Sequence, residues 1–348
     1  MAELISPSLI KVGYDVIIAG VGPAGCTLAE NLSSKYRVLI ADYRSLPREK
    51  PCGGMLVREA KEFVDKKKMP ADIFAGPKYL DIKYMDWNNG TETLIKKGFY
   101  NIHREKFDAW LFQSIKANNV NISANTKLID YYPTKKKNYV VAIFSSDGEI
   151  KGAVCKYLIG CDGALSTVRN KLTNTKVPYY IAMQELIDKK LCDDAYFIFD
   201  NSITDFYCWA IPKDDKTLIG AAIPPESARE RFELFKNKLS KRMGCTSLNG
   251  RLSSALLSRP NSIRQTFLGD KNVMLAGEAA GLISPSSGEG ISFAQYSGFY
   301  CAEAINKEYE NALPYYKEKC KPLIERIRAK LRKSEALKNV GKRPYLLK

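Results

Sequence analysis

The sequence predicts an α/β protein organised around one Rossmann-like βαβ unit, with a second sheet and a set of C-terminal helices added to it. The first observation is the stretch from Asp15 to Asp42, where an apolar strand runs into a glycine-rich turn and a helix. The second is a similar passage from strand to loop at residues 271–291. The third is a run of short, aromatic-rich strands across residues 180–222, which indicates a separate sheet.

The composition is that of a soluble protein with one unusual property, its charge. A chain of 348 residues is long enough for two domains, and 45% hydrophobic and 26% charged residues are ordinary values. The formal net charge is +16, and residues 317–348 contribute more than half of it. Such a tail favours an anionic partner, namely a membrane surface, nucleic acid or an acidic protein.

Several classes of chemistry are excluded by the residue counts. The nine cysteines are scattered without a C-x-x-C pair, so the sequence predicts neither a zinc site nor a disulfide framework. The one histidine, His103, excludes a two-histidine metal site and leaves little room for a Ser-His-Asp triad. The N-terminus does not have the pattern of a signal peptide, and no apolar run is long enough to span a membrane. We therefore expect a cytoplasmic protein with no metal, in which a cofactor supplies the chemistry.

The first glycine-rich turn has the spacing of a dinucleotide-binding fingerprint. Gly20 permits a tight turn, Gly22 lets a pyrophosphate approach the backbone, and Gly25 lets helix and strand pack closely. The helix that starts near Pro23 directs its N-terminal N–H groups at the phosphates. A second strand ends in Asp42, where an acid can accept hydrogen bonds from a ribose. The alternative is a tight βα turn without a ligand.

The segment that follows alternates loops, strands and helices. Pro51-Cys52-Gly53-Gly54 closes a loop, and its glycines would let the backbone pass a flat or bulky group. The alternative, which the spacing alone favours, is a simple entry into a helix. Arg104 opens a helix and is placed to reach a phosphate or ribose. The expected strands are Tyr79–Asp86, Thr91–Lys96, Val120–Ile122, Lys127–Tyr132 and Tyr139–Phe144.

Two further motifs follow buried strands, and a third lies in the aromatic-rich region. Asp162-Gly163 begins the pattern D-G-x-x-S-x-x-R, and Gly277-Glu278 precedes a Gly- and Ser-rich loop that enters a helix at about Gly290. That helix N-terminus is expected to offer N–H groups to an anionic group. Tyr207, Trp209 and Ile211 share one face of a strand, which is either core or the wall of an apolar pocket.

The C-terminal region is expected to be mostly helical. Leu323, Ile327 and Leu331 recur at helical spacing with basic residues between them. One interpretation is an amphipathic basic helix at a membrane surface. The other is a helix that caps the fold and leaves a solvated basic face.

The glycine fingerprint, the Asp-Gly motif and the Gly-Glu motif, in this order, resemble the FAD-binding fold of the para-hydroxybenzoate hydroxylase class. The third motif of that class usually carries Asp, where this chain has Glu278. The resemblance implies FAD as cofactor and a Rossmann-like FAD-binding domain interleaved with an antiparallel-sheet substrate domain, plus C-terminal helices. It assigns residues 1–75, 100–175 and 262–305 to the first domain, 76–99 and 176–261 to the second, and 306–348 to a basic helical region. The residues that it implies as cofactor contacts are Gly20, Gly22, Pro23, Ala24, Gly25, Asp42, Tyr43, Cys52, Gly53, Arg104, Leu128, Asp162, Gly163, Gly277, Glu278, Gly288, Gly290 and Ile291.

Within this class, two stretches look like the geranylgeranyl reductase family. The Cys52 loop matches that family's cysteine loop beside the flavin, and Tyr207-x-Trp209-x-Ile211-Pro212, seven residues, then Gly220-x-Ala222 resembles its motif Y-x-W-x-F-P-x7-G-x-G. Residues 199–209 are similar to the CbrA-like branch of that family. The resemblance implies reduction of carbon–carbon double bonds in a prenyl lipid, with Cys52, Tyr207 and Trp209 as catalytic residues.

The expected partners follow from the same resemblance and from the charge. Electrons would come from NAD(P)H, ferredoxin or free reduced flavin. We expect a monomer without nucleic acid, held by residues 317–348 at the inner face of an anionic membrane. Two alternatives stay open. The first is a flavin-dependent monooxygenase or halogenase, because Tyr-x-Trp-x-Ile-Pro also resembles the halogenase motif W-x-W-x-I-P. The second is a flavin-bearing membrane-surface protein without turnover.

Overall fold

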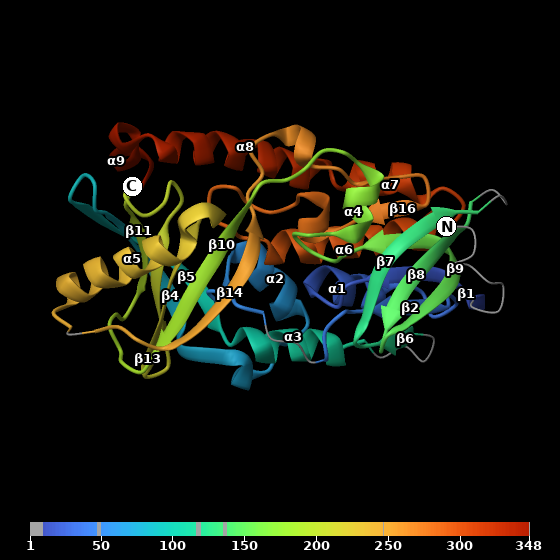
Figure 1. Ribbon diagram of the computed structural model, residues 1–348, viewed down its shortest axis with the longest axis horizontal. Coiled ribbons are helices and arrows are strands. Elements are labelled where there is room, and N and C mark those ends of the chain that lie inside the picture. The colour runs from blue at the N-terminus through green and yellow to red at the C-terminus, as the bar shows by residue number, and fades with distance from the viewer. Residues whose placement is uncertain (1–9, 47–49, 116–119, 135–137, 246, 348) are drawn as a thin grey trace.

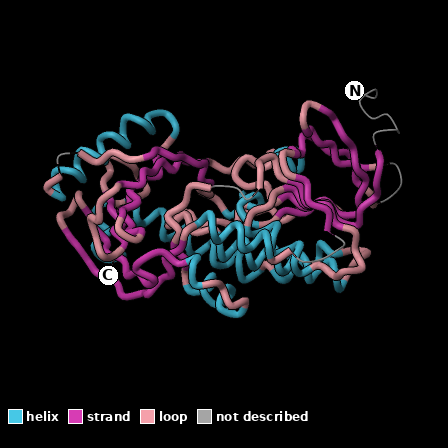
Figure 2. The backbone as a smooth tube through the Cα atoms, turned by 90° about the horizontal axis from the view of Figure 1, so that it is seen from below, coloured by secondary structure: helices cyan, strands magenta, loops and turns pink. Residues whose placement is uncertain are grey.

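The computed structural model describes residues 10–46, 50–115, 120–134, 138–245 and 247–347. Within these ranges the chain forms an elongated molecule with an eight-stranded sheet toward each end and helices between and around the sheets (Figures 1 and 2). The α/β fold expected from the sequence is confirmed.

The first sheet carries the βαβ unit. Its strands are β1 (Ile10–Ala19), β2 (Val38–Ala41), β6 (Val120–Ser123), β7 (Thr126–Pro133), β8 (Val140–Ser146), β9 (Glu149–Gly160), β15 (Gly269–Asp270) and β16 (Val273–Leu275). The order β16-β9-β1-β2-β6 is parallel throughout, while β7, β8 and β15 are attached by antiparallel pairing. Ala19 pairs with both Ala41 and Gly160, and Gly160 pairs with Leu275. The loops that follow four strands therefore meet at one edge of the sheet, where ligands bind in folds of this kind.

The second sheet follows the order β14-β10-β13-β12-β11-β4-β5-β3. Its strands are β3 (Met55–Leu56), β4 (Phe74–Asp86), β5 (Thr91–Ile102), β10 (Tyr179–Ile187), β11 (Ala195–Phe199), β12 (Cys208–Lys213), β13 (Lys216–Ile223) and β14 (Arg251–Ser258). All neighbours are antiparallel except β4 and β11, so the sheet expected to be antiparallel is mixed at this one pair.

Helices cover the first sheet and one face of the second. They are α1 (Pro23–Asn31), α2 (Arg58–Lys66), α3 (Arg104–Gln113), α4 (Thr167–Leu172), α5 (Ala228–Met243), α6 (Ile291–Lys307), α7 (Ala312–Lys319), α8 (Lys321–Lys338) and α9 (Arg343–Leu346), with short 3-10 turns at η3 (Ala71–Ile73), η4 (Pro225–Ser227), η5 (Ile263–Gln265), η6 (Gly277–Ala280) and η7 (Val340–Lys342). Phe232 and Phe235 of α5 are buried with Ala210 on one face of the second sheet, whereas Trp209 and Ile211 lie in a separate cluster on the other.

The C-terminal helix α8 runs along the edge of the molecule from α7 toward the second sheet (Figure 1). Leu323 and Ile327 are buried in the main core, and Leu331 packs against it. The apolar stripe of this helix therefore faces the protein, so the capping helix is the interpretation that the packing supports. No helix in the described parts of the chain has both the length and the hydropathy to cross a membrane.

Candidate functional site

The glycine loop after β1 is held tightly by its neighbours. Gly20 has φ +105°, and a Cβ there would lie 2.4 Å from the carbonyl oxygen of Cys161. A Cβ on Gly25 would lie 2.0 Å from the carbonyl oxygen of Gly20, so the turn and the close helix packing expected of these glycines are both present. Gly22 is the N-cap of α1, Pro23 follows it, and neither a side-chain cap nor an acid occupies the first turn. The N-terminal end of α1 is therefore suited to an anionic group.

Asp42, which is expected to bind a ribose, also stabilises the glycine loop through hydrogen bonds. It is 4% exposed, and its carboxylate accepts from the N–H of Val21 (2.8 Å) and of Arg44 (3.0 Å). Tyr43 is 56% exposed beside it. The Thr126 N–H donates to the Asp42 carbonyl at 2.8 Å, which brings the start of β7 and buried Leu128 to the same side of the sheet. These residues line one end of the candidate site.

The Asp-Gly and Gly-Glu motifs converge at the next two strand ends. One carboxylate oxygen of Asp162, Oδ2, accepts from the Thr167 N–H at 2.7 Å. The other, Oδ1, is buried with no hydrogen-bond partner among the described residues, and burial raises the pKa of this carboxyl. A Cβ on Gly163 would lie 3.9 Å from the Glu278 carboxylate, which itself accepts from the Ser258 N–H (2.8 Å). Since buried polar atoms in native proteins are nearly always paired, Asp162 Oδ1 indicates a missing hydrogen-bond donor.

The loop before α6 differs in one respect from the expectation. Gly288 has φ +62°, and Gly290 is the N-cap of the helix that starts at Ile291. The Glu289 carboxylate, however, accepts from the Ser292 N–H at 2.7 Å and from its hydroxyl at 3.0 Å. A partly buried acid thus occupies this N–H in the first turn of α6. The expectation that the N–H groups at this helix start are free for an anionic ligand is therefore not met at Ser292.

The Cys52 loop lies between α3 and the second sheet. A Cβ on Gly53 would lie 2.9 Å from Ile211 Cδ1, so the loop passes directly over the strand that carries the aromatic motif. Burial acts to raise the pKa of the Cys52 thiol, but the positive charge of Arg104, the Gly54 N–H and Lys50 outweigh it, and the pKa lies below its usual 9.0. Arg104 is nearly buried and forms an ion pair with Asp108 at 2.7 Å. The structure places Arg104 beside the thiol, where it stabilises the thiolate.

Tyr207, Trp209 and Ile211 form an aromatic and aliphatic wall with Phe197 on the face of the second sheet that α5 does not cover. Tyr207 stacks on Phe197 with ring centroids 4.9 Å apart, and its hydroxyl donates to the Ser287 carbonyl at 2.5 Å, in the loop before α6. The Trp209 ring lies over Gly220, where a Cβ would come within 2.3 Å of it. The glycine of the motif therefore makes room for the ring, which the sequence pattern did not explain.

Lys213 was missed by the sequence analysis. It is 8% exposed, and its ammonium donates to Asn101 Oδ1 (2.5 Å), the Ile102 carbonyl (2.9 Å) and the Gly54 carbonyl (3.3 Å). Burial lowers its pKa to about 7, and Cys52 and Asp214 act in the opposite sense. The sequence offers one indication of its role, namely its position directly after Pro212 at the end of the aromatic motif. Its hydrogen-bond partners are more than a hundred residues away, so no local pattern could have identified them.

Comparison with known proteins assigns the family. Over residues 13–330 the sequence matches the family described as an FAD binding domain. The chain belongs to this family. It is also 31% identical to Protein CbrA of Escherichia coli O6:H1 over 343 residues, which cover 96% of this chain and 93% of the relative. The flavoprotein is thus an FAD-dependent oxidoreductase of the branch that includes CbrA, as the sequence had suggested.

Solved structures show the same fold. A geranylgeranyl bacteriochlorophyll reductase-like protein from Thermoplasma acidophilum matches the flavoprotein with a TM-score of 0.80 at 20% identity, covering 94% of this chain and 88% of that one. PqsL, a probable FAD-dependent monooxygenase from Pseudomonas aeruginosa, matches with a TM-score of 0.72 at 14% identity, covering 97% of this chain and 100% of that one. At these identities both likenesses concern the fold alone.

The residues at the strand ends fit FAD. The N-terminal end of α1 suits its pyrophosphate, and Asp162 Oδ1, which lacks a donor, suits one of its hydroxyl groups. Glu278 keeps the carboxylate that this position usually carries and holds it with the Ser258 N–H and Lys50 (3.3 Å). The aromatic wall contacts both the Cys52 loop, through Ile211, and the loop before α6, through Tyr207.

Proposed function

We propose that the flavoprotein reduces carbon–carbon double bonds of a prenyl, geranylgeranyl-type lipid. The observation that carries this proposal is the wall of Tyr207, Trp209 and Ile211, which faces the Cys52 loop and is bonded to the loop before α6 through Tyr207. An isolated alkene has no polar handle, so recognition depends on shape and apolar contact, and this wall supplies both.

The chemistry needs a hydride at one alkene carbon and a proton at the other. FAD, once reduced by NAD(P)H, ferredoxin or free reduced flavin, supplies the hydride. Tyr207 and Trp209 orient the alkene and exclude water. Cys52 is the proposed proton donor, because its lowered pKa makes it a stronger acid than an ordinary thiol.

The test is an anaerobic single turnover. Protein reduced with dithionite is mixed with geranylgeranyl lipids, flavin reoxidation is followed by absorbance, and added hydrogen is measured by mass spectrometry. Trp209→Leu and Cys52→Ser are expected to slow saturation by on the order of 100-fold, the usual size of a lost positioning or proton-transfer contribution. Matched controls are Trp87→Leu and Cys245→Ser, both remote from the wall and grouped with the opposite face of the sheet. Reduced flavin that stays reduced with every prenyl lipid would contradict the proposal.

The same experiment separates the alternatives. Oxygen consumption coupled to a substrate, with an oxygen or halogen added to it, would favour the monooxygenase or halogenase. Bound FAD with no reoxidation by any substrate would favour a flavin-bearing surface protein.

We also propose that residues 317–348 bind an anionic membrane surface. Five basic side chains of this region form no ion pair or hydrogen bond with the described residues, namely Lys317, Lys330, Arg332, Lys333 and Lys342. Since the apolar stripe of α8 is buried, binding would be electrostatic and would weaken as salt rises. Changing all five to Gln should abolish sedimentation with phosphatidylglycerol vesicles while FAD stays bound. Equal binding to phosphatidylcholine vesicles, or unchanged binding by the variant, would contradict this role.

A further inference from the structure

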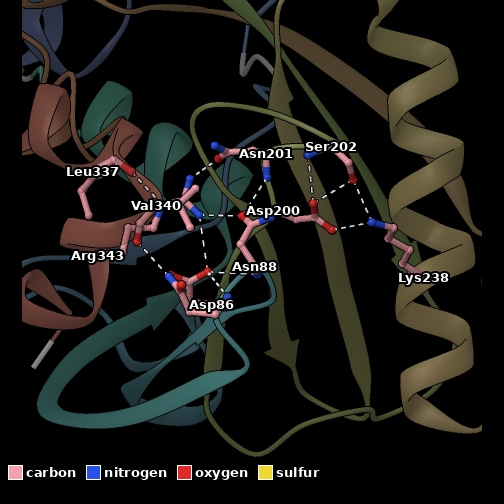
Figure 3. Close-up of polar contacts among 10 residues, drawn as sticks. Asp86, Asn88, Asp200, Asn201, Ser202, Lys238, Leu337, Val340 and Arg343 are labelled. Atoms are coloured by element: carbon pink, nitrogen blue, oxygen red, sulfur yellow. Dashed lines mark hydrogen bonds and ion pairs between the residues drawn. The ribbon is translucent and has the colours of Figure 1, made fainter.

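The chain beyond α8 is fastened to the second sheet by one buried arginine. Arg343 is 0% exposed. Its guanidinium donates to the Leu337 carbonyl (2.7 Å) and to Asn88 Oδ1 (2.7 Å), contacts Asn201, and lies 3.4 Å from the equally buried Asp86 (Figure 3). Asp86 and Asn88 belong to the β4–β5 hairpin. The end of the chain is therefore held at a defined position on the sheet.

This attachment brings two leucines against the outer end of the aromatic wall. Leu337 and Leu347 are buried together with Phe199, and Tyr84 and Tyr207 pack against this cluster. Phe199 and Tyr207 have ring centroids 6.1 Å apart. An apolar chain that follows the wall outward from Trp209 would thus meet these leucines next to Tyr207.

The same leucine also lines a surface cavity. It has a volume of about 250 Å³ and is lined by Tyr84, Thr91, Glu92, Thr93, Pro344 and Leu347. Tyr84 and Leu347 belong both to the apolar cluster and to the lining of this cavity. Leu347 therefore borders both the apolar cluster that Tyr207 packs against and this cavity.

We propose that Leu337 and Leu347 form an end-stop that limits the length of the apolar chain bound along the aromatic wall. Arg343 is a positioning residue, because it holds the segment that carries Leu347. The inference rests on the proposed function in that the bound chain is apolar and linear, and it adds a specificity determinant to that site.

The experiment measures binding separately from reduction. The holoprotein with oxidised FAD is titrated with geraniol, farnesol, geranylgeraniol and longer polyprenols, and the dissociation constant is read from the change in the flavin spectrum. Affinity in the wild type is expected to rise with length and then to fall at a limiting length. Leu347→Ala should move this limit to longer chains and strengthen binding of the first excluded polyprenol by on the order of 10-fold, because a few more methylenes are buried in the enlarged space.

A second substitution keeps the test independent of a general loss of packing. Leu347→Phe enlarges the stop and should move the limit to shorter chains. Leu331→Ala is the matched control, since Leu331 lies on α8 but packs against the main core, and its length profile should match the wild type. Melting temperature and FAD absorbance confirm that each variant is folded.

The outcomes separate the two proposals. An unchanged length limit in both Leu347 variants overturns the end-stop, whatever the enzyme does to the lipid. A shifted limit without any saturated product supports the end-stop and overturns the reductase proposal. If no polyprenol of any length changes the flavin spectrum of the wild type, both proposals are wrong.

Discussion

At the Cys52 loop, burial and neighbouring charges set the charge state of two side chains. Cys52 has Arg104 and Lys50 on one side, and Lys213 holds the Gly54 carbonyl on the other. Neither Arg104 nor Lys213 lies in a motif that identifies it as a partner of the thiol. Their effects are nevertheless measurable by titration.

The first prediction concerns the thiol. The pKa of Cys52 should lie below 9.0 in the wild type, because the charge of Arg104 favours the thiolate. Arg104→Gln should raise it, and Arg104→Lys should largely restore it. The measurement is the pH profile of iodoacetamide alkylation, with peptide mass spectrometry to distinguish Cys52 from Cys245, whose profile serves as the internal control. Identical Cys52 profiles in all three proteins would show that Arg104 does not act on the thiol.

A second prediction concerns the buried lysine. Unfolded Lys213 keeps its proton up to about pH 10.5, whereas the folded side chain releases it at about 7. Between these values the unfolded state binds more protons, so this residue makes the free energy of unfolding rise with pH. The wild type should therefore gain stability relative to Lys213→Met as the pH is raised from about 7 to about 9, in addition to a pH-independent offset from the lost hydrogen bonds. Urea denaturation measures the free energy of unfolding of both proteins at each pH. A difference between the two proteins that stays constant across this range would contradict the prediction. Repeating the comparison in a Cys52→Ser background removes the contribution of the thiol.

At the scale of elements, the β12–β13 pair shows how a motif glycine works. Trp209 and Gly220 are cross-strand partners, and the indole lies flat on the glycine. The pair thus holds the ring against the sheet while its other side remains part of the wall. Helix α8 likewise has one buried face and one exposed face.

Gly220→Ala should displace the Trp209 ring. The added methyl would lie 2.3 Å from the ring, and overpacking of this kind costs about 1–3 kcal/mol. Chemical denaturation should report that loss, and a changed tryptophan emission spectrum should report the displaced ring. Gly13→Ala, where nothing lies within 4 Å of the new Cβ, is the control and should be close to neutral. Equal stability of the two variants would mean that the ring has room to move.

Truncation should lower stability strongly on the buried face of α8 and hardly at all on its exposed face. Ile327 is 0% exposed, so Ile327→Ala should cost about 2–5 kcal/mol in the free energy of unfolding. Arg328, one position along, is exposed and pairs with Glu325 at 3.6 Å, so Arg328→Ala should change stability by less than about 0.5 kcal/mol. Denaturant titration of both variants makes the comparison. Comparably small losses would indicate that α8 is not a capping helix.

At the scale of the whole molecule, the C-terminal helices connect parts of the chain that the motifs leave separate. Arg326 of α8 pairs with Glu59 of α2 at 3.2 Å, the Ser334 hydroxyl donates to the Pro285 carbonyl at 3.0 Å, and Arg343 reaches Asp86. α8 and α9 thus span from the FAD-binding sheet to the outer end of the second sheet. Their position is what places Leu337 and Leu347 at the end of the wall.

Removal of the buried arginine should release this connection. Arg343→Met leaves the buried Asp86 without its cation and should cost about 3–5 kcal/mol. Limited proteolysis should then cut near residues 339–342 much faster than in the wild type, while FAD absorbance is retained. Lys342→Met is the matched control, because Lys342 is exposed and should leave the digestion pattern unchanged. Equal digestion rates for Arg343→Met and the wild type would show that other contacts hold the segment.

Short-range patterns were sufficient for the βαβ unit, the order of the motifs and the family, because strand, glycine turn and helix are specified by residues within about one motif of each other. They were also sufficient to predict that the apolar stripe of α8 is a helix face, although not which surface it meets. The contact of the Ser292 N–H with Glu289 is local, because the two residues are three positions apart. The buried Lys213 beneath the Cys52 loop and the Arg343 attachment depended on packing. Lys213 and Arg343 take partners more than a hundred residues away, and no local pattern records which distant carbonyl or carboxylate a buried cation will meet.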